Sequence, residues 1–231
     1  MIKVFLILIA LNICIFGAQQ IIVVVSNDFN SSKAVMSCFE GSKKVFSNID
    51  VNIGRNGLAW GVDEKKFQHK ENEPLKFEGD GKSPAGVFSI TSTFGYEDHN
   101  FSVPYIKSDE DRICVDDSNS TFYNKIIKMP DNQLSSFEYM KRDDDQYNIG
   151  AVVDYNPHGI KNRGSCIFLH VQKEMGHATA GCTSMRYHDL EKILKWLDPD
   201  KTPVLLQIPK SYLEDAEKLF PQIIEKTNDL K

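Results

Sequence analysis

The chain has 231 residues, of which 27 are lysine or arginine, 32 are aspartate or glutamate, and 41% are hydrophobic. This composition is ordinary for a globular protein, and the length fits one large domain or a domain with small extensions. The net charge of −5 argues against a nucleic-acid partner, because phosphate backbones are bound by basic surfaces.

The first 18 residues have the pattern of an export signal. Lys3 supplies a positive charge, an apolar run follows from Val4 to Phe16, and Gly17 and Ala18 are small residues suited to cleavage. The run is short for a membrane span, although an uncleaved anchor is the alternative. Removing these residues leaves 26 basic and 32 acidic side chains, a net charge of −6. We therefore expect an exported protein, residues 19–231, without stable membrane insertion.

Most of the elements predicted in the first two thirds of the chain are strands. Gln20–Ser26 is a compact β-branched run and predicts a buried strand, while residues 32–46 alternate and predict either strand or a short helix. A glycine-rich turn at 54–61 leads into a strand. A second, denser turn at 79–86 precedes an alternating strand at 87–91. Further strands are predicted at 148–155, 165–171 and 203–208.

Two helices are predicted near the C-terminus. Residues 187–197 place four leucine and isoleucine residues on one face, and residues 211–226 return to helical spacing with Pro221 as a kink or division. The pattern as a whole predicts a mainly β fold with peripheral α-helices (α+β). We expect one catalytic domain over 19–231, with 209–231 as its C-terminal helical extension.

Four cysteines remain beyond the signal segment: Cys38, Cys114, Cys166 and Cys182. In an exported protein they are able to form two disulfides, or to keep one catalytic thiol beside paired or buried cysteines. Their spacing leaves both alternatives and the pairing open. No Cys-x-x-Cys is present, and the turn at 79–86 lacks the spacing of a phosphate-binding loop, so we expect neither a metal nor another cofactor.

Cys182 and His170 form the strongest candidate for chemistry. His170 ends an apolar run, and Cys182 directly follows Gly181 among small hydroxyl residues. A thiol attacks as its thiolate, and a nearby imidazolium or the N-terminus of the helix expected after Ser184 would favour that form. Gly181 lets a substrate carbonyl approach the backbone, where amides are able to form an oxyanion hole. Each residue alone is more often part of a core, but together they predict a nucleophile and its base.

The stretch from Ile167-Phe168-Leu169-His170 to Thr179-Ala180-Gly181-Cys182 resembles the active-site motif of L,D-transpeptidases of the YkuD type. The upstream segments 79–88, 115–118 and 122–124 are similar to parts of the same catalytic domain. The resemblance as a whole covers roughly residues 54–208. It implies a β-rich sandwich or barrel and a location in the periplasm or cell envelope of a bacterium. It also implies acyl-enzyme chemistry on the stem peptides of peptidoglycan.

Carried over by position, the resemblance implies that Cys182 is the nucleophile and His170 the proton donor and acceptor. It implies that a backbone carbonyl orients this histidine, and that the oxyanion is supported near Cys182. The residues proposed for that support are Gly181, Thr183 and Thr179. Weaker candidates for contacts with acidic stem peptides, equally explained as turn or surface residues, are Arg55, Lys82, Tyr123, Asn124 and Arg186.

The motif departs from that of many family members at two positions, which leaves the acyl acceptor open. Ala180 stands where many members have histidine, and Ser184 where they have arginine. Transfer to an amine would make a cross-link or attach a protein. Transfer to water would make an L,D-carboxypeptidase, or a hydrolase that releases terminal D-alanine or a wall-linked protein.

Three rival interpretations belong to other classes. A metallopeptidase would use His158, His170, His177 and His188, but no His-Glu-x-x-His pattern is present. A non-catalytic cell-wall-binding module would bind stem peptides without using the thiol. A papain-like protease is disfavoured because its cysteine precedes its histidine in the chain, the reverse of the order here.

Overall fold

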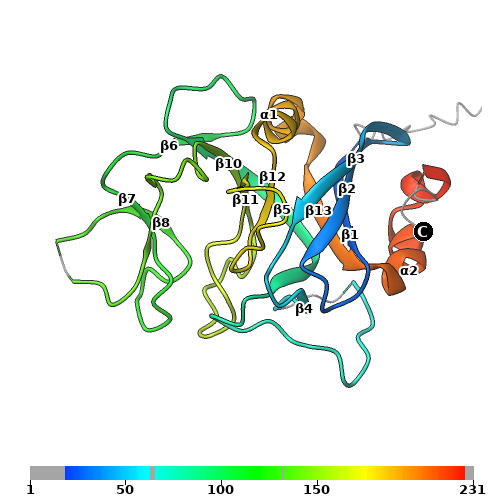
Figure 1. The fold of residues 1–231 in the computed structure, drawn as a ribbon, viewed down its shortest axis with the longest axis horizontal. Helices are drawn as coiled ribbons and strands as arrows, with labels where there is room; N and C mark the ends of the chain where they lie inside the picture. Colours follow the sequence, from blue (N-terminus) through cyan, green and yellow to red (C-terminus); the bar gives the residue numbers. More distant parts are fainter. Residues whose placement is uncertain (1–18, 63–65, 132, 227–231) are drawn as a thin grey trace, which may run out of the picture.

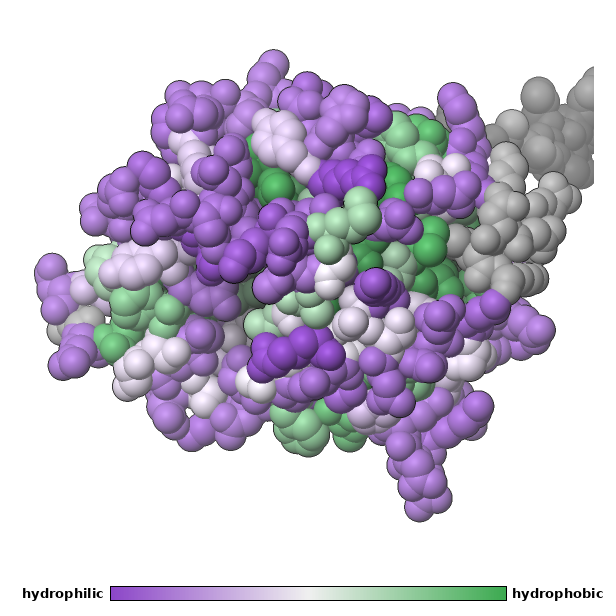
Figure 2. Space-filling model, viewed as in Figure 1, coloured by the Kyte–Doolittle hydropathy of each residue, from purple (hydrophilic) through white to green (hydrophobic). Residues whose placement is uncertain are grey.

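The computed structural model describes residues 19–62, 66–131 and 133–226, and its elements are mostly strands (Figure 1). The predicted signal segment 1–18 lies outside the described residues. The face seen in Figure 2 is largely hydrophilic. Because most of the elements are strands, the mainly β prediction is confirmed. The β-branched and aromatic residues of these strands form much of the core.

One large sheet contains ten strands: β1 (Gln20–Ser26), β2 (Lys33–Glu40), β3 (Lys43–Asn52), β4 (Leu58–Trp60), β5 (Ser83–Gly95), β6 (Tyr105–Lys107), β10 (Ile149–Val153), β11 (Phe168–Val171), β12 (Thr183–Met185) and β13 (Val204–Pro209). Their order is β10-β11-β12-β3-β2-β1-β13-β5-β4, and β6 pairs with β5. Because β10 also pairs with β5, the sheet closes on itself and resembles a barrel.

The strands expected from the sequence are present, with two differences in detail. Residues 32–46 form β2 and the start of β3, joined by a turn at Gly41, so the helix alternative is wrong. β5 runs on to Gly95 rather than ending at 91, because its first half pairs with β13 and its second half with β10. This long strand therefore connects the core of the sheet to the region of the candidate site.

The helices lie around the sheet. Helix α1 (Tyr187–Trp196) buries Leu190, Ile193 and Leu194 as predicted. After the short turn η1 (Pro199–Lys201) and strand β13, the C-terminal segment divides into η2 (Lys210–Tyr212), α2 (Leu213–Leu219) and η3 (Pro221–Lys226), with the break at the expected proline. Among the described helices, none is both long enough and apolar enough to cross a bilayer.

A second, small sheet was not predicted. It consists of β7 (Arg112–Cys114), β8 (Ile126–Lys128) and β9 (Glu138–Tyr139), in the order β8-β7-β9. In Figure 1 it lies on the opposite side of the molecule from α2. A disulfide between Cys114 and Cys166 joins it to the loop before β11. The apolar cluster at this junction contains Phe94, Cys114, Met140, Tyr147, Cys166, Phe168 and Cys182.

Candidate active site

Two adjacent parallel strands bring Cys182 and His170 together. β11 and β12 pair with Leu169 opposite Thr183 and His170 opposite Ser184, so Cys182 lies immediately before β12, beside the histidine strand. Both side chains line one cavity of about 360 Å³. The other lining residues are Arg55, Glu138, Arg142, Gln146, Tyr147, His177, Ala178, Thr179 and Ala180.

The backbone of Cys182 is fixed by two hydroxyl groups. Its carbonyl accepts hydrogen bonds from Ser83 Oγ at 3.0 Å and from Thr179 Oγ1 at 2.6 Å. Thr179 Oγ1 also accepts the amide of Gly181 at 3.1 Å. A side chain at Gly181 would place its Cβ 3.0 Å from the carbonyl oxygen of Lys82, which explains the glycine. Of the three residues proposed for oxyanion support, Thr179 and Gly181 thus hold the turn.

Thr183, the third of these residues, begins β12. Its buried hydroxyl donates to the side-chain oxygen of Gln207 on β13 at 2.7 Å. The Thr183 side chain therefore ties β12 to the centre of the large sheet. Ser83, which the sequence analysis did not single out, contributes more directly to the position of the nucleophile.

The thiol of Cys182 is buried, with 8% of the residue exposed. Its Sγ accepts the amide of Phe168 and donates to the carbonyl of Cys166, both at 3.3 Å. Burial raises the pKa of Cys182 to about 12, the negative charge of Glu138 adds to the rise, and the Phe168 amide opposes it. The expectation that a helix N-terminus favours the thiolate is wrong, because β12 separates Cys182 from α1.

His170 is oriented by a backbone carbonyl, as the family resemblance implies. Its Nδ1 lies 2.8 Å from the carbonyl oxygen of Val171, which only accepts hydrogen bonds, so Nδ1 carries the proton and Nε2 keeps a lone pair. Burial lowers the pKa of His170 to about 4. At neutral pH the imidazole and the thiol are therefore both uncharged. This differs from the expectation of a thiolate stabilised by a nearby imidazolium, because burial disfavours the charged forms of both Cys182 and His170.

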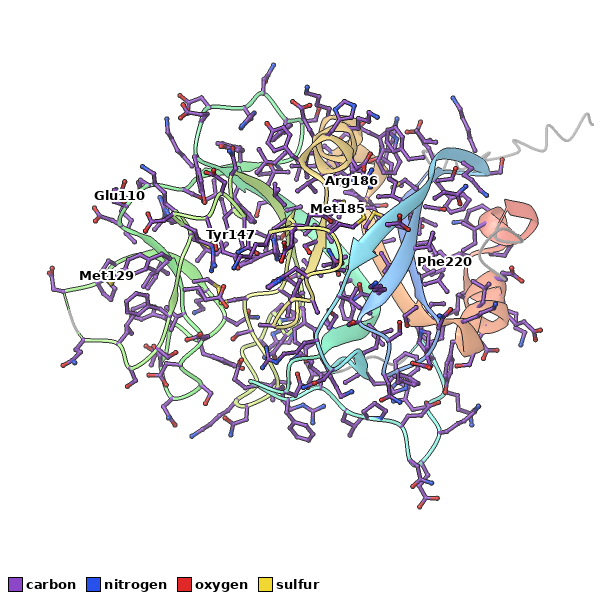
Figure 3. All side chains as sticks on the ribbon, viewed as in Figure 1. Glu110, Met129, Tyr147, Met185, Arg186 and Phe220 are labelled. Carbon is purple, nitrogen blue, oxygen red and sulfur yellow. A yellow bond between two sulfur atoms is a disulfide. The ribbon has the colours of Figure 1, made fainter. Side chains whose placement is uncertain are left out.

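A layer of residues that the sequence analysis missed covers the His–Cys pair. The ring of Tyr147 lies 5.3 Å from that of His170, and its hydroxyl donates to Glu138 Oε2 at 2.7 Å. The guanidinium of Arg142 lies 5.1 Å from the centre of the Tyr147 ring and is held by Asp144 through bonds of 2.9 and 2.6 Å. Figure 3 shows Tyr147 between the small sheet and β11. These residues follow no periodic pattern, so no sequence signal marked them.

Among the predicted substrate contacts, Arg55 lines the cavity. Two backbone hydrogen bonds fasten its segment to the turn before Cys182: Arg55 N–H donates to Thr179 O at 2.9 Å, and Thr179 N–H donates to Ile53 O at 3.0 Å. Lys82, by contrast, donates through Nζ to Asn56 O at 2.5 Å and does not border the cavity. Arg186 approaches Met175 Sδ at 3.9 Å, also away from the cavity.

Tyr123 and Asn124, the other two predicted contacts, hold the loop before β11. The buried Tyr123 donates its hydroxyl to Glu78. Asn124 accepts the amide of Cys166 at 2.8 Å and donates to the carbonyls of residues 155 and 156. Their bonds are internal to the protein and determine where the Cys166 carbonyl meets the thiol.

A second cavity, of about 170 Å³, also borders Cys182. It shares Arg55, Glu138, Ala180 and Cys182 with the first cavity. It adds Lys76, Glu78, Gly79, Asp116, Ser165, Cys166, Ile167 and Gly181. A larger cavity of about 500 Å³ lies between residues 66–70 and 211–219 and contains neither Cys182 nor His170.

The histidines do not assemble into a metal centre within the described part of the chain. There, no group of three or more histidine, cysteine, aspartate or glutamate side chains is placed to hold a metal ion. His170 and His177 line the cavity, whereas His158 and His188 do not.

One of the comparisons with known proteins identifies a family, which agrees with the mainly β fold. The family model of YkuD, described as the L,D-transpeptidase catalytic domain, matches residues 19–206. No curated protein and no solved structure matches the chain significantly. Because the family match covers most of the chain, the protein belongs to the YkuD family of L,D-transpeptidase catalytic domains.

Proposed function

We propose that this protein is an exported, cysteine-dependent enzyme that modifies peptidoglycan stem peptides through an acyl-enzyme, as an L,D-transpeptidase. The observation that carries the proposal is the shared cavity of Cys182 and His170 on neighbouring strands of a YkuD domain. The disulfide between Cys114 and Cys166 supports export, because disulfides persist in oxidising compartments.

In the proposed reaction, His170 Nε2 takes the thiol proton as Cys182 Sγ attacks the carbonyl carbon of the stem peptide. The bond from that carbon to the nitrogen of the terminal D-amino acid breaks, and His170 returns the proton to the leaving amine. A thioester remains on Cys182. Because Sγ now donates to the Cys166 carbonyl, we expect the side chain to rotate toward His170 before attack.

The same histidine serves the second half of the reaction. It removes a proton from the acceptor, whose nitrogen or oxygen attacks the carbonyl carbon of the thioester. The bond between that carbon and Cys182 Sγ breaks, and His170 returns the proton to Sγ, which restores the thiol. We assign stabilisation of the oxyanion to the backbone around Cys182, which the bonds from Ser83 and Thr179 hold still. Groups that are already in place need no reorganisation as charge develops.

The second candidate is transfer to water, which would make the enzyme an L,D-carboxypeptidase. The observation behind it concerns the two positions that depart from the family pattern. Ala180 borders both cavities without a polar group, and Ser184 is 1% exposed, with its Oγ 3.5 Å from Asn52 Nδ2. Neither side chain offers a polar contact that would hold an amine acceptor.

Mass spectrometry of purified muropeptides distinguishes the two candidates. Tetrapeptide and pentapeptide forms are incubated separately with residues 19–231, with Cys182→Ala, and with Cys38→Ala as a control that removes the other free buried thiol. A new dimer mass that requires Cys182 indicates a transpeptidase, and loss of D-alanine alone indicates a carboxypeptidase. Turnover by Cys182→Ala would refute the thiol mechanism, and binding without turnover would indicate a non-catalytic module.

A further inference from the structure

We propose that Glu138 is a specificity-determining residue, whose carboxylate binds a cationic amine of the substrate in the smaller cavity beside Cys182, with Asp116 as a second anionic contact. The inference rests on the proposed function and adds a chemical requirement to it. The preferred acyl donor is a stem peptide that carries a free side-chain amine next to the bond that is cleaved.

The position of Glu138 is fixed relative to the thiol through a short path of bonds. In the small sheet, Glu138 on β9 pairs with Cys114 on β7. Cys114 is linked by the disulfide to Cys166, and the carbonyl of Cys166 accepts the hydrogen bond from Cys182 Sγ. Glu138 also borders both cavities that contain the thiol. Its carboxylate is thus held at the reaction centre by the architecture of the small sheet.

The two carboxylates retain capacity to accept a ligand. Tyr147 donates to Oε2 of Glu138, which leaves Oε1 as an acceptor. Oδ1 of Asp116 is buried without a hydrogen-bond partner among the described residues. A buried carboxylate oxygen without a partner is costly, and an ammonium group in the cavity would supply the missing donors.

The other charged groups of this cavity are already engaged by the protein. Lys76 Nζ donates to Asp80 Oδ1 at 2.5 Å and to the Phe77 carbonyl at 2.8 Å. Glu78 Oε2 accepts the hydroxyls of Tyr123 and Ser165. Neither residue forms a described hydrogen bond with the carboxylate of Glu138 or Asp116. The remaining cation of the lining, Arg55, borders both cavities and suits a carboxylate of the same substrate.

Electrostatics connect amine binding to the reactivity of the thiol. The charge of Glu138 contributes to the raised pKa of Cys182, and burial and Asp116 in turn raise the pKa of Glu138. A bound ammonium would neutralise Glu138 and remove this unfavourable effect on the thiolate. The other side chains that act on this pair are Tyr147, Arg142, Glu78 and Lys76, and the amide of Phe168 also acts on the thiol. We expect these groups to keep their charges when an amine binds, so that the change at the thiol comes from the ligand.

The first test compares donor tetrapeptides whose third residue has a free side-chain amine with the same peptides after acetylation of that amine. Wild type should prefer the free amine by about tenfold or more in kcat/KM, as expected for a desolvated charge pair. Glu138→Gln keeps an acceptor for Tyr147 and should lose the preference, mainly through a slower reaction of the amine-bearing donor. Glu110→Gln, which removes an exposed carboxylate that pairs with Lys141, should keep it. A preference unchanged in Glu138→Gln overturns the inference.

The second test does not depend on turnover. In a protein of residues 19–231 that carries Cys38→Ala, Cys182 is the remaining free cysteine of the described residues, and its alkylation by iodoacetamide reports the thiolate fraction. Butylammonium chloride should accelerate alkylation at pH 8 in wild type, whereas butanol should not. Glu138→Gln should react faster without additives and should not respond to the amine. An equal response of both proteins overturns the inference, whereas the expected response without any muropeptide turnover would refute only the proposed function.

Discussion

Two regions of the molecule meet at Cys182, and they are built differently. The large sheet supplies the thiol and His170 from paired strands of a closed barrel. The small sheet supplies Glu138 from strands of two or three residues and is fastened beside the site by a disulfide. The bond-making groups thus lie on the rigid framework, while a charge that acts on the thiol lies on an element too short to be stable alone.

The largest effect is expected in the large sheet. His170→Gln should lower kcat/KM by about 10²–10⁴-fold, the usual contribution of a general acid–base group. Circular dichroism and the melting temperature check that the variant folds. His188→Gln, on the exposed face of α1, is the matched control and should retain full activity. An active His170→Gln would mean that another group accepts the thiol proton.

An intermediate effect is expected where the two regions are joined. Replacing both Cys114 and Cys166 by alanine, or adding a reductant, should lower the free energy of unfolding by about 2–4 kcal/mol, since the disulfide spans 52 residues. Because Glu138 and the Cys166 carbonyl then lose their fixed positions, kcat/KM should also fall. Chemical denaturation and muropeptide turnover measure the two effects. As a control, Cys38→Ala should remain as sensitive to reductant as wild type. A double variant of Cys114 and Cys166 with wild-type activity would show that the small sheet keeps its position without the disulfide.

The smallest effect concerns the pH dependence of the reaction and tests how deeply the large sheet buries His170. With the pKa of His170 near 4, protonation removes the base only as the pH falls toward that value. Between pH 8 and pH 5, kcat/KM should therefore fall by only about one tenth, whereas a histidine with an ordinary pKa of about 6.5 would lose most of its activity. A pH profile of kcat/KM on one muropeptide decides this. An acidic limb centred near 6.5 would show that His170 is more solvated than its burial implies.

The sequence predicted the regular part of the molecule well, because periodic patterns determine it. The β-branched run of β1 and the apolar face of α1 depend on local spacing and burial, which a single sequence displays. The motif likewise placed Cys182 and His170 on neighbouring segments, and the structure brings them into one cavity.

The rest of the site depends on contacts between distant residues. Ser83 reaches the carbonyl of Cys182 across 99 positions, and Glu138 lies in a two-residue strand without alternation. The spacing of the cysteines allowed several pairings, and only the folded chain selects Cys114 with Cys166. The protonation states were missed for a related reason, because the depth of burial that sets the pKa values of Cys182 and His170 is a property of the folded chain.

The pairing of β1 with β13 has a consequence for how the chain folds. These strands come from opposite ends of the described chain, yet they lie side by side in parallel over six residue pairs at the centre of the large sheet. A contact of such high sequence separation closes late, because the entropy of closing so long a loop must be offset first. Because synthesis proceeds from the N-terminus, one edge of β1 therefore stays unpaired until residues 204–209 have been made. Deletion of the last third of the sequence should yield an aggregation-prone fragment rather than a smaller stable domain.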